Sequence, residues 1–186
     1  MNAPYIRLQE GVELLPFDCG DKDLNEFFTK DAINYQRGLF AVTYYLENDE
    51  ETILYFTLSN DKLSAIETTK SFWRKVKDSI PHEKHRKDFP AVKIGRFAVG
   101  KKFQQSDAHW GTITLKFIKR WMVSENKTGC RFITVDAYKN AVPFYKKNNF
   151  KFMGKEEEER YLSDIKSPES EGTYSMYFDL SRINSD

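Results

Sequence analysis

The segment from Gly95 to Gly111 contains the residues whose types and order come closest to a binding chemistry. Val92–Val99 is rich in apolar and β-branched residues and predicts a strand, and apolar residues recur at helical spacing over Ile113–Met122. A polar loop between a strand and a helix leaves backbone N–H groups unpaired where the helix dipole favours negative charge. These residues therefore predict a phosphate cradle. An ordinary strand–helix connection remains the alternative.

Three ionisable side chains, two in this segment and one at the end of a later strand, are candidates for a role in the chemistry. Arg96 is on the predicted central strand, and because both faces of such a strand are usually covered, its charge should reach an edge or a cleft, where it would contact a substrate or a cofactor. His109 carries an imidazole, the side chain that most often acts as a general base, and Asp136 lies at the end of another predicted strand. Either could act as a general base, although a structural role is the alternative for both.

Composition limits the classes of protein to consider. A chain of 186 residues with 40% hydrophobic and 15% aromatic residues predicts one folded domain, residues 1–186. It has no apolar run of membrane-spanning length and no signal-peptide pattern, so we expect no membrane association and a cytoplasmic location. Cys19 and Cys130 lack metal-ligand or redox spacing. We therefore expect two buried thiols and no metal.

Basic residues are concentrated in one stretch of the chain. Between Lys70 and Lys102 eleven Lys and Arg residues stand against three acids, a local charge of +8 in a chain of net charge +1. Such a block can attract a polyanion or the phosphates of a cofactor. A solvated face without a ligand is the alternative, above all for Lys84–Lys87.

The remaining elements predict an α/β (α+β) fold, with a mixed sheet of six or seven strands and about four helices. Asp21 is a good N-cap for a helix that ends at Gly38, and Pro143 suits the first turn of a later helix. Pro81–Pro90 reads as a loop. The predicted strands are Tyr5–Gln9, Ala41–Leu46, Thr52–Leu58, Val92–Val99, Arg131–Asp136 and Thr173–Leu180, and the helices are Asp21–Arg37, Lys70–Ile80, Ile113–Met122 and Asn140–Lys147.

Three of these stretches, in this order, resemble the GNAT family of acyl-CoA-dependent N-acetyltransferases. They are the segment Val99–Thr112, the run Asn140–Phe150 and the closing strand. The second is the most specific, because the family commonly has Ala-x-x-Phe-Tyr-x-x-x-Gly-Phe there. This chain matches the motif except at Asn149, which replaces the glycine. Asparagine is the next best residue for a left-handed backbone, so the turn can form.

Two further stretches are similar to the GNAT subgroup that contains toxins acetylating the amino group of aminoacyl-tRNA. They are Phe17–Phe28 and Phe56–Ser59. With the three stretches above, the resemblance covers most of the chain. It implies the GNAT (acyl-CoA N-acyltransferase) fold for the whole domain.

The loop before the central helix departs from the family pattern. Family members usually have two glycines there, so that successive backbone N–H groups surround the pyrophosphate of coenzyme A. Here Gly111 matches the second, but His109 stands at the first, and the loop is a residue or two longer. A side chain at position 109 limits the approach of the phosphates, and Asp107 adds an unfavourable charge. The helix N-terminus, Lys101 and Lys102 remain to attract them.

The resemblance implies acetyl transfer from acetyl-CoA to an amine, leaving coenzyme A. It places the donor to the thioester carbonyl on the backbone of Phe97–Val99, and the acid that protonates the thiolate on Tyr145, whose ordinary pKa is about 10. Core packing is the alternative role for Tyr145. Asn140 is either a helix N-cap or a coenzyme A contact. The full set implied for the coenzyme is Phe97, Ala98, Val99, Gln104, Gln105, Trp110, Gly111, Thr112 and Asn140. Arg96 is the acceptor contact inferred above from its place on the strand.

Three functions follow as hypotheses. The first is an N-acetyltransferase acting on a small-molecule or protein amine. The second is a toxin-type enzyme acting on aminoacyl-tRNA, which the subgroup resemblance and the basic stretch favour. The third is a GNAT-fold interaction or regulatory protein with an altered coenzyme A site. The acceptor stays open, as do a homodimer and an antitoxin partner.

Overall fold

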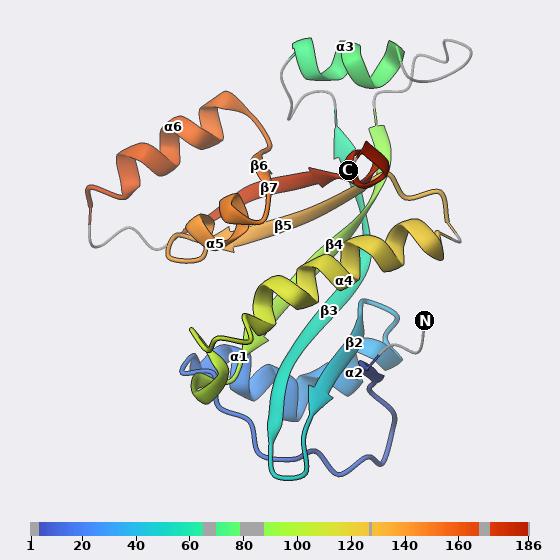
Figure 1. Cartoon of the computed structure of the whole chain (residues 1–186), viewed down its shortest axis with the longest axis vertical. Helices are drawn as coiled ribbons and strands as arrows, with labels where there is room; N and C mark the ends of the chain where they lie inside the picture. Colours follow the sequence, from blue (N-terminus) through green and yellow to red (C-terminus); the bar gives the residue numbers. More distant parts are fainter. Residues whose placement is uncertain (1–3, 65–69, 79–87, 127, 168–171, 186) are drawn as a thin grey trace. The chain divides into compact units, whose positions relative to one another are not determined.

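The computed structural model describes residues 4–64, 70–78, 88–126, 128–167 and 172–185. Seven strands form one mixed sheet in the order β1-β2-β3-β4-β5-β7-β6 (Figure 1). This confirms the predicted sheet. The strands are β1 Ile6–Arg7, β2 Val42–Glu47, β3 Thr52–Ser64, β4 Asp88–Val99, β5 Phe132–Tyr138, β6 Lys151–Phe152 and β7 Thr173–Asp179. The helices are α1 Lys22–Glu26, α2 Ala32–Arg37, α3 Lys70–Asp78, α4 Trp110–Ser124, α5 Val142–Lys147 and α6 Lys155–Asp164, with short 3-10 turns over Lys101–Phe103 and Leu180–Ser185.

The chain forms two compact units, each described by itself. Unit 1 comprises residues 1–60 and 93–118, and unit 2 comprises residues 61–92 and 119–186.

In unit 1 the predicted first helix forms, but with an irregular middle. Asp21 caps it as expected, since its side chain accepts a hydrogen bond from the Leu24 N–H at 3.1 Å. Between α1 and α2 the segment Phe27–Asp31 is a π-helix, in which the Ala32 N–H bonds to the Phe27 carbonyl five residues back. Sequence periodicity did not predict this segment.

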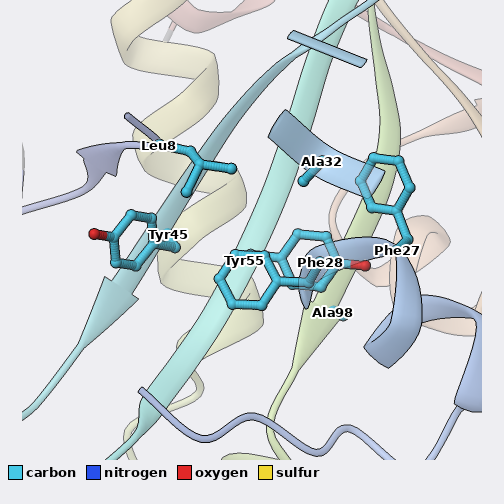
Figure 2. Packing of buried hydrophobic residues seen from close by; sticks show 7 residues of the cluster. All are labelled: Leu8, Phe27, Phe28, Ala32, Tyr45, Tyr55 and Ala98. Carbon is cyan, nitrogen blue, oxygen red and sulfur yellow. The ribbon is translucent and has the colours of Figure 1, made fainter. Parts of the chain in front are cut away.

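The core of unit 1 is an aromatic cluster between this helix and the strands (Figure 2). The rings of Phe28 and Tyr55 stack with centroids 4.6 Å apart. The Tyr55 hydroxyl donates a hydrogen bond of 2.7 Å to the Leu24 carbonyl, so this buried polar group is satisfied. The β2–β3 hairpin brings Tyr45 opposite Tyr55 in register, as the predicted hairpin requires.

In unit 2 the strands β5, β7 and β6 pair antiparallel, with Val135 opposite Met176 and Phe152 opposite the same methionine (Figure 1). β4 begins at Asp88, so the prediction of a loop as far as Pro90 was wrong at its end; residues 81–87 lie outside the described part. Burial explains the difference, because Phe89 is buried and its ring lies 4.9 Å from that of Trp73.

Candidate functional site

In unit 1 the end of β4 passes into the predicted loop through a close backbone contact. The Gly100 N–H donates to the Ile53 carbonyl at 2.8 Å, and the Lys101 N–H donates to the Asp18 carbonyl at 2.8 Å. A Cβ at position 100 would lie 3.3 Å from the Ile53 oxygen. Glycine therefore allows the chain to leave the strand here.

Gln104 holds this loop against its surroundings within unit 1. Its Nε2 donates to the Cys19 carbonyl at 2.9 Å and to the Val99 carbonyl at 2.8 Å. The side chain that the resemblance assigns to the coenzyme is thus already bonded to the backbone. Its observed contribution is to position the end of β4.

The loop keeps left-handed backbone without the usual glycine. His109 has φ of +48° and Gln105 has φ of +56°, and both side chains are exposed. The His109 N–H donates to the Ser106 carbonyl at 2.9 Å, and its own carbonyl accepts from the Ile113 N–H at 3.1 Å. His109 thus has the backbone conformation for which glycine is favoured.

Helix α4 begins directly after this turn. Trp110, Gly111 and Thr112 form its first turn, where backbone N–H groups have no acceptor four residues back within the helix. The two lysines expected to attract phosphates are both ion-paired: Lys101 lies 3.3 Å from Asp18, and Lys102 lies 2.6 Å from Glu51. The loop therefore offers a phosphate its backbone N–H groups rather than unpaired lysine side chains.

Side chains at the end of β4 alternate between the two faces of the strand. Ala98 is buried in the aromatic cluster (Figure 2), whereas Phe97 and Val99 are half-buried. Arg96 lies on the same side of the strand as Ala98. Its guanidinium carbon is 3.6 Å from the centroid of the Phe27 ring and 5.3 Å from that of Tyr35.

This stacking gives Arg96 a structural partner that the sequence did not indicate. A guanidinium over an aromatic face is stabilised by about 0.5–2 kcal/mol. Stacking uses the face of the planar group and leaves its edge for hydrogen bonds, so a role in acceptor binding is compatible with it.

In unit 2 the candidate acid, Tyr145, lies in the last turn of α5, and that helix ends in a Schellman motif. The Phe150 N–H donates to the Tyr145 carbonyl at 3.0 Å, and the Asn149 N–H donates to the Lys146 carbonyl at 3.0 Å. Asn149 has φ of +65°, the left-handed conformation predicted for it.

The Schellman motif also explains why the matched run has aromatic residues at Tyr145 and Phe150. A Schellman turn usually carries an apolar contact between these two positions, and the Tyr145 and Phe150 rings lie 5.3 Å apart, edge to face. A second edge-to-face contact, of 5.2 Å, joins Tyr145 to Phe144. Only 7% of Tyr145 is exposed, and burial raises the pKa of its phenol above the ordinary value.

A buried lysine supports the end of the same helix. Lys119 Nζ donates to the Asn148 carbonyl at 2.5 Å and lies 3.8 Å from the centroid of the Phe178 ring. A cation is favourable at a helix C-terminus, where carbonyl groups lack intrahelical partners. Sequence reasoning missed Lys119, because a lysine within a helix usually indicates a solvated face.

The remaining candidates are placed as follows. Asn140 is an exposed turn residue, and the N-cap of α5 is Ala141, so the N-cap prediction for Asn140 was wrong. Asp136 is exposed and accepts a hydrogen bond of 2.8 Å from the Ser175 hydroxyl. Cys130 is buried as expected, but Cys19 is only partly buried. In the part of the chain that the structure describes, no three His, Cys, Asp or Glu side chains gather as a metal site would require.

The structure thus brings the candidates together in two sets. Residues Arg96–Val99 and Gln104–Thr112 lie in unit 1, and Asn140 and Tyr145 lie in unit 2. A pocket of 570 Å³ in unit 2 was not predicted, and none of the candidate residues lines it.

No family model matches the sequence. Solved structures match nearly the whole chain. A bacterial toxin superposes with a TM-score of 0.71 at 15% identity, covering 97% of this chain and 92% of the toxin. AtaT complexed with acetyl-methionyl-tRNAfMet gives 0.68 at 22% identity, covering 97% and 96%. A tyrosine-to-phenylalanine mutant of KacT gives 0.68 at 17% identity, with the same coverage. The chain has the GNAT fold.

The match to these solved structures confirms the GNAT fold that the resemblance implied. Within it, the left-handed turn at Asn149 after α5 is the local feature that the matched motif predicted; the left-handed turn at His109 before α4 was not predicted, and both are formed without glycine. Among the described helices none is both long enough and apolar enough to cross a membrane.

Proposed function

We propose that this chain is an acetyl-CoA-dependent N-acetyltransferase that acts on a primary amine. The observation that carries the proposal is Tyr145, buried in α5 with its backbone held by the Schellman turn, in a chain of GNAT fold. The seven-stranded sheet includes strands from both units and supports treatment of residues 1–186 as one domain.

The described residues fit coenzyme A at the predicted loop. His109 forms a left-handed turn before α4 without glycine at position 109, which supports binding of the phosphates by the backbone N–H groups of the first turn. The proposed contacts are the backbone of Phe97, Ala98 and Val99, together with Gln104, Gln105, Trp110, Gly111, Thr112 and Asn140. When bound, the coenzyme would supply the acetyl group as a thioester.

The chain would contribute two groups to the transfer. A backbone N–H of Phe97–Val99 would donate a hydrogen bond to the thioester carbonyl oxygen, and Tyr145 would donate its Oη proton to the departing thiolate sulfur as the new C–N bond replaces the C–S bond. Because burial raises its pKa, Tyr145 keeps its proton at neutral and moderately alkaline pH. No metal takes part in this scheme. Solvent water would accept the proton released by the amine and return a proton to the Tyr145 phenolate, which completes the proton balance.

A toxin-type enzyme acting on aminoacyl-tRNA is the second candidate. The AtaT complex with acetyl-methionyl-tRNAfMet, at 22% identity over 97% of this chain, favours it, and so does the local charge of +8 over Lys70–Lys102, part of which lies outside the described residues. Arg96 is the proposed acceptor contact. Binding of tRNA should then weaken steeply with salt, as phosphate contacts require.

Partners follow from the same comparisons. AtaT has been solved bound to the C-terminus of its antitoxin, AtaR. An antitoxin is therefore a proposed partner of this chain, and a homodimer in the cytoplasm is the proposed state. A GNAT-fold interaction or regulatory protein is the remaining candidate. It is supported by Lys101, Lys102 and Gln104 in the loop, whose side chains are ion-paired or hydrogen-bonded to other residues of unit 1.

The test combines binding with turnover. Acetyl-CoA and desulfo coenzyme A should both bind in calorimetric titration. Tyr145→Phe should reduce turnover by about 10²–10⁴-fold, the usual contribution of acid catalysis, with little change in unfolding temperature because the ring contacts persist. The rate should not decline around pH 10, where an ordinary tyrosine loses its proton.

Tyr174→Phe provides the matched control. Its hydroxyl donates to Asp164 at 2.7 Å in the same unit, so this variant should lose stability and keep its turnover per folded molecule. Turnover of Tyr145→Phe equal to the wild type would remove Tyr145 from the mechanism. If neither coenzyme binds at millimolar concentration, the enzyme proposal fails.

A further inference from the structure

A cationic pocket in unit 2 is the feature that the proposed acetyl transfer does not use. It has a volume of 570 Å³, within the range of small-molecule sites, and is lined by residues from α5, β6, α6, β7 and their neighbours. Five of the lining side chains are Lys or Arg and two are acids, a net charge of +3. The cations are Arg131, Lys146, Lys151, Lys155 and Arg182.

Both acids of the pocket are already paired. Arg131 donates to both carboxylate oxygens of Asp179, each at 3.2 Å, and Lys146 lies 3.8 Å from Glu158. Asp179 also accepts bonds from the backbone N–H and hydroxyl of Ser181. The anionic groups of the wall are therefore largely satisfied, and they neutralise only two of the five cations.

The other three cations have no such partner. Lys151, Lys155 and Arg182 are exposed and form no ion pair or hydrogen bond through their side chains with the described residues. They come from β6, from α6 and from the segment after β7, so folding brings Arg182 to the same pocket as two lysines that lie much earlier in the sequence. Clustering of like charges without counter-charges costs free energy unless an anion is bound between them.

The backbone beside these cations also favours an anion. Gly154 lines the pocket and is the N-cap of α6, a helix of ten residues, without a side-chain cap hydrogen bond. The positive end of that helix dipole adds to the field of the lysines, while Glu156, Glu157 and Glu158 in the first turn of α6 oppose it. Phe152, half-buried with Lys146 Nζ 5.4 Å from its ring centroid, gives the pocket one apolar wall.

We propose that this pocket binds a ligand carrying at least two phosphate charges. Three unpaired cations exceed what a single carboxylate neutralises, whereas a phosphate ester carries up to two charges and three acceptor oxygens that suit lysine and arginine. Two sources share this chemistry, a free nucleoside diphosphate and the phosphate backbone of a nucleic acid. The proposal is independent of acetyl transfer, because none of the residues assigned to that reaction lines the pocket.

The experiment is calorimetric titration with inorganic pyrophosphate, ADP, a short RNA hairpin and citrate. It uses the full chain carrying Gly111→Leu, so that the proposed coenzyme A loop does not contribute. Pyrophosphate should bind with a Kd on the order of 0.1–1 mM at low salt, as expected for two or three charge-assisted contacts. Affinity should fall as salt rises. Tighter binding of ADP would identify the nucleotide as the source, and tighter binding of the hairpin would identify the nucleic acid.

The deciding variant is Lys151→Gln with Arg182→Gln, both exposed positions where folding should be preserved. It should weaken pyrophosphate binding by about tenfold or more. The control is Lys147→Gln with Lys166→Gln, which removes the same charge from exposed sites of unit 2 outside the pocket and should leave the affinity unchanged. No binding of any phosphate probe, equal losses in both double variants, or citrate binding as tight as pyrophosphate would each overturn the proposal.

Discussion

The left-handed turn at His109 predicts that glycine is more stable than alanine at this position, whereas alanine should be the more stable at Lys116 in the helix that follows. Because φ is +48° at His109, a Cβ is strained, and the left-handed conformation costs an L-residue about 1–2 kcal/mol. His109→Gly should therefore be more stable than His109→Ala by about 1 kcal/mol. For a chain of this size that difference corresponds to about 2–4 °C in unfolding temperature.

The magnitude depends on what the substitution leaves intact. Both hydrogen bonds of residue 109, to Ser106 and from Ile113, use backbone atoms, so glycine and alanine retain them equally. The imidazole is exposed and has no bonded partner among the described residues. Comparison of glycine with alanine therefore isolates the backbone conformation.

Lys116, exposed within α4, provides the matched control. In a helix interior glycine is less favourable than alanine by about 0.8–1.0 kcal/mol, so Lys116→Gly should be the less stable of that pair. Urea unfolding of the four variants without ligand measures both differences. If alanine at position 109 proves as stable as glycine there, the left-handed turn is not present in solution and the argument for a preserved coenzyme loop loses its basis.

Two further predictions concern the same framework. Asn149 has φ of +65°, so Asn149→Gly should leave the free energy of unfolding within about 0.5 kcal/mol of the wild type or raise it. Asn149→Ala should lower the free energy of unfolding by about 1 kcal/mol, because alanine is strained in this conformation. Equal stabilities of the two variants in thermal unfolding would contradict the Schellman turn. Gln104→Ala removes two hydrogen bonds to backbone carbonyls and should weaken acetyl-CoA binding several-fold, a loss of binding free energy that corresponds to about one net hydrogen bond. Gln105→Ala, which removes an exposed side chain from the same loop, serves as its control.

The sequence predicted those parts of the fold in which local pattern and tertiary packing agree. The hairpin, the capped first helix and the strand–loop–helix at β4 all follow from periodicity and turn residues, and the structure contains them. The start of β4 was missed because Phe89 and Pro90 lie in a polar, proline-bounded stretch. There burial against Trp73, which is distant in the sequence, decides the conformation.

The candidate site was predictable in its residues more than in their interactions. Nothing in the identity of Gln104, Lys101 or Arg96 shows that the first holds two backbone carbonyls, that the second pairs with Asp18, or that the third stacks on Phe27. The basic pocket was missed for a related reason. Its cations are scattered from residue 131 to 182, whereas a count along the chain finds only charges that are consecutive in sequence.

The π-helical segment Phe27–Asp31 has a consequence for comparing this chain with its structural relatives. A turn closed by a bond to the fifth preceding residue contains one residue more than an α-helical turn. Successive residues of an α-helix are about 100° apart, so the extra residue rotates every later side chain of the helix by that amount. A relative with an uninterrupted helix would need a one-residue gap between Glu26 and Ala32. Placed before Glu26, that gap would align Phe28 with the counterpart of Phe27, although the two rings occupy different places in the core.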